Sequence, residues 1–192
     1  IQTVLISHLH GDHFGGLPFL LLDAHFVARR RAPLTVAGPP GLRRRLAQAQ
    51  EVFFPGSAAL ELGFPLELVE LPARAPTALG ALSVTPFEVD HPSGAPAFAL
   101  RVEAGDRTLA YSGDTAWTEA LLDAARGTDL FVCEAYGLDR PVPHHLDART
   151  VLARRDAFGC KRLVLTHLGE AALAQADALG AEVARDGLVL EV

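Results

Sequence analysis

The feature that most constrains this chain is a run of metal-binding residue types directly after a short apolar segment near its start. Residues 3–7 predict a buried strand, and a histidine-rich loop follows, Ser-His-Leu-His-Gly-Asp-His. His8 and His10 are two residues apart, so in extended chain their side chains point to the same side and can bind one cation. Asp12 and His13 lie past a glycine that lets the chain turn, so they can face a second cation.

Three further candidate ligands each stand at the end of a predicted strand. They are His91, Asp114 and His167, after strands predicted at 82–87, 107–111 and 162–166. Side chains at strand ends converge on a shared edge of a layered sheet. Taken singly, each has an ordinary alternative: a surface histidine, a turn aspartate or a helix-capping histidine. Together with the first cluster they favour a site for divalent metal, and imidazole with carboxylate suits zinc.

Strands and helices alternate along the chain, which predicts an α/β layered fold in a single domain spanning residues 1–192. The remaining strands are predicted at 34–37, 66–71, 97–103, 130–133 and 188–192. Helices are predicted at 15–27, 41–50, 117–125, 147–158 and 170–179. Residues 104–106, Ala-Gly-Asp, are typical of a hairpin turn between two of these strands.

Composition excludes several classes of protein. A hydrophobic fraction of 49% excludes a disordered chain. The formal net charge of −6 argues against broad binding to nucleic acid or to an anionic membrane. The most apolar stretch, residues 14–22, is too short to span a membrane, and no signal peptide is recognisable. Cys133 and Cys160 are the two cysteines, which fits a reducing, cytoplasmic compartment.

The order of these motifs resembles the metallo-β-lactamase superfamily: His-x-His-x-Asp-His, then a single histidine, then Ser-Gly-Asp-Thr, then Thr-His. The resemblance implies an αββα sandwich with two metal ions at one edge between the sheets. It places one ion on His8, His10 and His91. It places the second on Asp12, His13 and His167, with Asp114 bridging the two.

The beginning of the chain departs from the superfamily pattern. The chain opens at Ile1 and contains no methionine. The superfamily's first strands, with their glycine-rich turn and an aspartate before the histidine motif, have no counterpart in it. We therefore expect a sandwich that lacks its N-terminal strands, in a chain that is N-terminally incomplete.

Finer features resemble the phosphodiesterase branch of the superfamily, which includes ribonuclease Z and a cyclic-phosphate phosphodiesterase. Residues 36–42, Val-Ala-Gly-Pro-Pro-Gly-Leu, resemble the strand, turn and helix that follow the first motif there. Cys133-Glu134-Ala135 resembles the branch's His-Glu-Ala motif, with cysteine in place of histidine. His145 stands where the branch has a catalytic histidine that binds no metal, although it also reads as a surface histidine.

The resemblance implies a metal-dependent hydrolase, a phosphodiesterase that uses a hydroxide bridging two metal ions. Zinc is the expected metal, with manganese and iron open. Asp12 would hold the hydroxide as well as bind metal. His145, oriented by Glu134, would stabilise a phosphoryl oxygen or protonate the leaving alkoxide.

A small phosphodiester or a short nucleic-acid end is the expected substrate, with no membrane partner and with a homodimer left open. Structured tRNA is not expected, because only 23 positions separate His91 from Asp114, where bacterial ribonuclease Z carries its tRNA-gripping arm. Two alternatives remain open. One is hydrolysis of lactones, thioesters or β-lactams, and the other is a non-catalytic metal-binding module.

Overall fold

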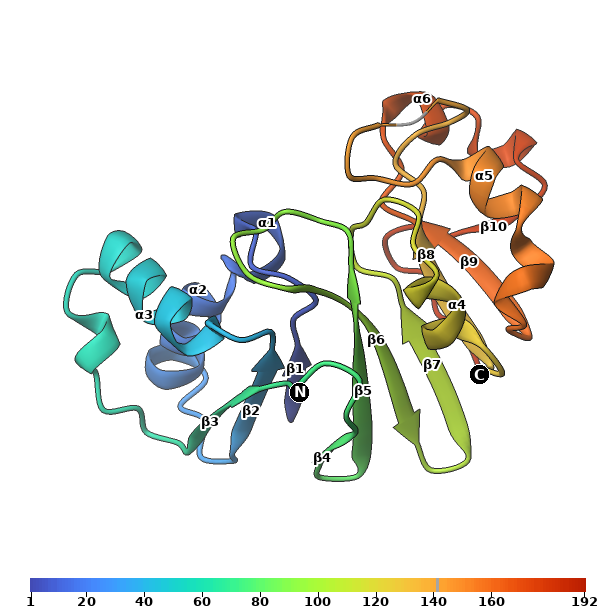
Figure 1. Ribbon diagram of the computed structural model, residues 1–192. Helices are drawn as coiled ribbons and strands as arrows, with labels where there is room; N and C mark the ends of the chain where they lie inside the picture. Colours follow the sequence, from blue (N-terminus) through green and yellow to red (C-terminus); the bar gives the residue numbers. More distant parts are fainter. Residues whose placement is uncertain (141) are drawn as a thin grey trace. The chain divides into compact units, whose positions relative to one another are not determined.

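The computed structural model describes residues 1–140 and 142–192 (Figure 1). The chain divides into two compact units, and each is described by itself. The first comprises Ile1–Pro72 and Ser93–Pro96, and the second comprises Ala73–Pro92 and Ala97–Val192. Each unit combines a sheet with helices, so the predicted α/β class is confirmed.

The first unit contains a three-stranded parallel sheet in the order β1-β2-β3. Its strands are β1 (Thr3–Leu5), β2 (Leu34–Gly38) and β3 (Leu66–Glu70). Its helices are α1 (Gly11–Phe14), α2 (Leu17–Leu22) continuing into the π-helical η1 (Asp23–Val27), α3 (Leu42–Phe53) and the short η2 (Ser57–Ala59). Parallel strands need crossover connections, and helices supply them between these strands.

Local sequence explains how α3 begins. Gly41, just before the helix, has a φ of 92°, a conformation that costs glycine little because it has no Cβ. Leu42 and Leu46 follow one helical turn apart, and both side chains are buried in the core of the first unit. The glycine therefore turns the chain so that the apolar face of α3 meets the core.

The second unit is built on a seven-stranded sheet in the order β10-β9-β8-β7-β6-β5-β4. Its strands are β4 (Thr77–Leu79), β5 (Leu82–Val89), β6 (Ala97–Ala104), β7 (Arg107–Tyr111), β8 (Leu130–Glu134), β9 (Arg162–Thr166) and β10 (Glu182–Val183). Strands β4 to β7 pair antiparallel, and β7 to β10 pair parallel. The predicted hairpin between β6 and β7 is confirmed.

Helices of the second unit are short. They are α4 (Ala120–Ala125), α5 (Ala148–Ala153) followed by η3 (Arg155–Phe158), and α6 (Glu170–Leu173) followed by η4 (Ala176–Ala178). Asp147 caps α5 by accepting a hydrogen bond of 2.8 Å from the Thr150 amide. Phe131 and Phe158 meet in the core of the unit at 5.0 Å between ring centroids. In the described parts of the chain, no helix combines the length and apolarity that crossing a membrane requires.

Sequence reasoning misplaced the last strand. The apolar residues 188–192 were predicted to form a strand, but they form none. The last strand, β10, lies earlier, at Glu182–Val183. Arg162 at the start of β9 donates two hydrogen bonds to Glu182, of 2.8 and 2.6 Å, which bring this segment to the edge of β9. The three-residue strand β4 was not predicted, because it lies in a stretch rich in proline, glycine and alanine.

The sheet of the second unit brings several strand ends to one edge. Strands β7, β8 and β9 run parallel, and β5 has the same direction because it is antiparallel to β6, which is antiparallel to β7. The carboxyl ends of all four therefore meet at the same edge (Figure 1). Polar loops follow each of these strands.

Candidate metal centre

The histidine-rich segment of the first unit gathers its imidazoles around the end of β1. The ring centroids of His8 and His10 lie 5.0 Å apart, and those of His8 and His13 lie 4.0 Å apart. The expected loop includes one helical turn, α1, and His10 precedes it with an extended backbone. This turn returns His13 toward His8, so three imidazoles lie together.

Contacts within this cluster orient two of its side chains. Ser7 Oγ lies 3.1 Å from Nδ1 of the fully buried His8, so a ligand role for His8 falls to Nε2. The Asp12 carboxylate lies 3.6 Å from His13 Nε2. Its side chain is 72% exposed, so it sits at the solvent side of the cluster.

Two loops of the second unit are tied together beside His91 and Asp114. The Asp90 amide donates to Thr115 Oγ1 at 3.1 Å, and the Ala116 amide donates to the Asp90 carbonyl at 3.0 Å. His91 Nδ1 lies 3.0 Å from the His144 carbonyl oxygen, the kind of bond that leaves Nε2 for a metal. Both His91 and Asp114 are buried.

Glu134, at the end of β8, accepts hydrogen bonds from several segments at once. Its carboxylate is fully buried and lies 2.6 Å from the Thr115 amide, 3.3 Å from the Tyr136 amide and 3.2 Å from the Leu146 amide. His145 Nδ1 lies 3.0 Å from Oε1 of the same carboxylate. A buried carboxylate requires such donors, and here they come from the segment after β7 and the segment after β8, which it links.

His145 is held from two sides. Glu134 binds its Nδ1, and the Tyr136 ring stacks on the imidazole at 4.9 Å with an interplanar angle of 29°. The His91 ring lies 5.1 Å away. These contacts set the plane of the imidazole, with Nδ1 on the Glu134 carboxylate. Sequence reasoning did not assign the stacking role of Tyr136, although an aromatic residue just after Glu134-Ala135 was an available signal.

His167 completes this group. Its Nδ1 lies 3.5 Å from Asp114 Oδ1, and its backbone has a φ of 54°, which is unusual for a residue other than glycine. The ligand atoms of His91, Asp114 and His145 lie within 4.8 Å of one another, as do those of Glu134, His145 and His167. Imidazole and carboxylate groups in this density fit a divalent metal such as zinc.

The structure therefore assembles the predicted residues as two sets, one in each unit. The first unit brings together His8, His10, Asp12 and His13. The second brings together His91, Asp114, Glu134, His145 and His167.

Cys133 stands where the motif has histidine. Its thiol does not act as a charged group in these contacts. Burial, with the Glu134 charge adding to it, raises the pKa of the Cys133 thiol well above its usual range. The side chain packs in the apolar core of the second unit. Both cysteines are free thiols.

Sequence comparison finds a family model and curated relatives. The model described as the beta-lactamase superfamily domain matches residues 1–168. An uncharacterized protein of Mycobacterium bovis is 33% identical over 170 residues, which cover 86% of this chain and 61% of that protein. The chain thus spans about three fifths of that relative's length. Ribonuclease Z of Ignicoccus hospitalis is 30% identical over 223 residues, covering 87% of this chain and 70% of the relative.

Solved structures match the whole chain. The short form of human tRNase Z has a TM-score of 0.76 and 24% identity, and the match covers 79% of that chain. A diphosphatase from the PhnP family has a TM-score of 0.74 and 19% identity, with 72% of that chain covered. The metallo-β-lactamase fold protein YhfI of Bacillus subtilis has a TM-score of 0.74 and 19% identity, with 78% covered.

Proposed function

Because the chain belongs to the β-lactamase superfamily, in its ribonuclease Z-like branch, we propose that it is a metal-dependent hydrolase of phosphodiesters. The predicted metallo-β-lactamase fold is confirmed by the solved structures that match the whole chain. We further propose that the two units form one domain over residues 1–192, in which both ligand sets serve one centre.

The donor chemistry of the two sets supports a centre for two divalent ions, with zinc as the metal. The proposed ligands are His8, His10, Asp12, His13, His91, Asp114 and His167, with Asp114 shared between the ions. When bound, the ions would supply positive charge to the phosphoryl oxygens and Lewis acidity to activate water. The protein's own part is to hold these side chains, through Ser7 on His8 and the His144 carbonyl on His91.

One observation supports a hydrolytic centre over a non-catalytic metal module: the Glu134–His145 pair lies beside the ligand group of the second unit. With Nδ1 bound to Glu134, His145 carries a proton on Nε2 when the imidazole is charged, and can deliver it to a leaving alkoxide. An alkoxide leaving group needs that proton. A thioester releases a thiolate that needs no such proton, and a non-catalytic metal module gives the residue no task. A lactone or a β-lactam also releases a group that must be protonated, and the similarity to a ribonuclease Z favours the phosphodiester over these two.

The alignments support a small substrate or a short nucleic-acid end over structured tRNA. The alignment to the archaeal ribonuclease Z is 223 positions long, but only 87% of the 192 residues take part, so about 56 positions of that enzyme face gaps. The alignment to the mycobacterial protein is nearly free of such gaps. The negative net charge points the same way, because tRNA binding relies on neutralising phosphates. The free thiols support the proposed cytoplasmic location.

The test combines metal analysis with a substrate panel. The protein, loaded with zinc, is assayed on bis-p-nitrophenyl phosphate, a lactone, a cephalosporin and precursor tRNA at about 0.15 M salt. We expect two ions per chain and hydrolysis of the diester above all other substrates. His91→Ala should mainly empty one site, whereas Asp114→Ala should lower the occupancy of both.

Three results would contradict the proposal. Trace metal after zinc loading would remove the proposed centre, and activity on the lactone or cephalosporin alone would identify the alternative hydrolase. Trimming of tRNA as fast as hydrolysis of the small diester would contradict the proposed substrate size. Circular dichroism of each variant distinguishes loss of metal from loss of fold.

A further inference from the structure

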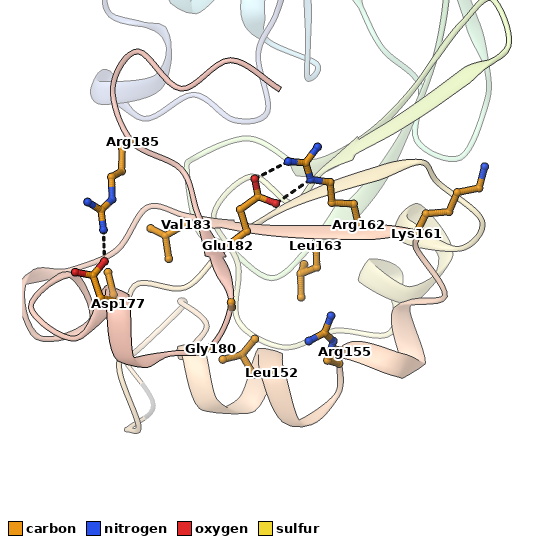
Figure 2. A pocket seen from close by; sticks show the side chains of 12 residues that line it. Leu152, Arg155, Lys161, Arg162, Leu163, Asp177, Gly180, Glu182, Val183 and Arg185 are labelled. Atoms are coloured by element: carbon orange, nitrogen blue, oxygen red, sulfur yellow. Dashed lines mark hydrogen bonds and ion pairs between the residues drawn. The ribbon is translucent and has the colours of Figure 1, made fainter. Parts of the chain in front are cut away.

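The second unit contains a cavity whose lining includes none of the candidate metal ligands. Its volume is about 530 Å³, and three segments line it: α5 with η3, the start of β9, and the chain from η4 through β10 (Figure 2). The candidate ligand His167 follows the other end of β9, five residues from Arg162 and about 16 Å along the chain at about 3.3 Å per residue. The cavity is therefore a separate place on the unit.

Positive charge gathers in this cavity although the unit around it is acidic. The second unit has 11 Lys and Arg residues against 17 Asp and Glu. Four of those 11 line the cavity, namely Arg155, Lys161, Arg162 and Arg185. Of the described residues, two acidic ones line it, Asp177 and Glu182. Basic residues that are concentrated in one cavity of an acidic unit favour the binding of an anion in that cavity.

Two of these arginines are held in fixed orientations. Arg162 donates two hydrogen bonds to Glu182, of 2.8 and 2.6 Å, and Arg185 is paired with Asp177 (Figure 2). The mutual bond raises the pKa of Arg162 and lowers that of Glu182, so the pair stays charged at neutral pH. Lys161 reaches instead to Asp129, at 2.6 Å, and contributes less to the cavity.

Arg155 is different from the other three cations. Among the described residues its guanidinium group makes no hydrogen bond or ion pair, and Figure 2 shows its side chain on the same wall as Leu152, facing Leu163. A methyl group added at Gly180, which also lines the cavity, would meet no atom within 4 Å, so the space beside that backbone is open. An anion entering here would meet a guanidinium that no carboxylate neutralises.

We propose that this cavity binds a small phosphorylated molecule, with Arg155 as the principal phosphate contact. The planar fork of arginine presents several N–H donors to a phosphate group. Leu152 and Leu163 provide an aliphatic surface for the uncharged part of the ligand, and the volume lies in the range of small-molecule sites. This inference is independent of the proposed hydrolase activity.

The experiment is isothermal titration of the zinc-loaded protein with AMP, and with adenosine as its uncharged match. We expect AMP to bind and adenosine to bind far more weakly, with the affinity for AMP falling as salt rises. Arg155→Ala should weaken AMP binding about tenfold, which corresponds to about 1.4 kcal/mol. Arg149→Ala is the matched control, because it removes the same charge from an exposed arginine on α5 outside the cavity and should leave the affinity unchanged.

Each contrary outcome overturns the inference in a recognisable way. Equal losses in the Arg155 and Arg149 variants would show a general charge effect. Adenosine binding as tightly as AMP would show that the phosphate is not recognised. If Arg155→Ala has no effect and Asp114→Ala abolishes binding, AMP binds at the candidate metal centre instead. Circular dichroism of the variants ensures that a lost affinity is not a lost fold.

Discussion

Replacing Glu134 with glutamine tests whether one buried carboxylate holds the loops of the candidate site. Its Oε1 receives the Thr115 amide and His145 Nδ1, and its Oε2 receives the Tyr136 and Leu146 amides. In glutamine one of the two oxygens becomes an NH₂ group, which cannot accept, so two donors lose their acceptor whichever way the amide turns. At about 1.5 kcal/mol for each bond to a charged group, Glu134→Gln should lower the free energy of unfolding by about 3 kcal/mol.

Urea unfolding followed by tryptophan fluorescence measures this loss. Trp117 is the one tryptophan in the sequence, and it packs against Phe158 at 5.8 Å and beneath the Arg154 guanidinium at 4.1 Å. With a slope of about 2 kcal/mol/M, the midpoint should fall by about 1.5 M while the slope is unchanged. His145→Ala is the matched control, because it removes a single, partly exposed donor and should cost about 1 kcal/mol or less.

Two results would refute this reasoning. The first is a Glu134→Gln variant whose unfolding free energy lies within about 0.5 kcal/mol of the unmodified protein. The second is an equal loss in the His145→Ala control, which would assign the stability to the imidazole. Measurements with zinc and with a chelator separate the contribution of the carboxylate from that of any bound metal.

Three further outcomes are expected. His145→Ala should keep its metal content by elemental analysis while diester turnover falls by about 10²–10⁴-fold, the usual contribution of a general acid; a loss of metal would identify a ligand instead. Gly169→Ala should lower the free energy of unfolding in urea by about 1–3 kcal/mol, because the new Cβ would lie 2.8 Å from the Tyr136 carbonyl oxygen and 3.3 Å from its ring; an unchanged free energy would contradict the contact. Arg162 lowers the pKa of Glu182 from 4.5, so the stability that Glu182→Gln removes should be present above about pH 4.5 and vanish as the pH falls below it; an equal difference at pH 7 and pH 3 would exclude this pair as the cause.

Local sequence predicted most of the elements that carry the site. The strand predicted at 162–166 is β9 with the same bounds, and 107–111 is β7. Both are apolar runs between turn-forming residues, and such runs are recognisable from neighbours alone. The short β4 and the pairing of Glu182–Val183 with β9 were missed, because two- and three-residue strands carry little pattern and are chosen by their partners.

The candidate site also has features that the sequence predicted and features that it did not. That His91, Asp114 and His167 can serve a metal follows from residue type and from their places after predicted strands. His145 was predicted from the resemblance to the phosphodiesterase branch. The stacking of Tyr136 on His145 did not follow from sequence. It depends on the tertiary structure around these two residues, which lie nine positions apart in the chain.

The sequence by itself determined which chemical groups follow each strand, because strand ends and turns depend on residues close together in the chain. Only the tertiary structure decided that one carboxylate, Glu134, receives donors from residues as far apart as Thr115 and Leu146. It also decided that Arg155 and Arg185, far apart in the sequence, line one cavity. Contacts between residues so far apart in the chain depend on how distant segments pack against a common sheet. A pattern of neighbouring residues does not encode that packing.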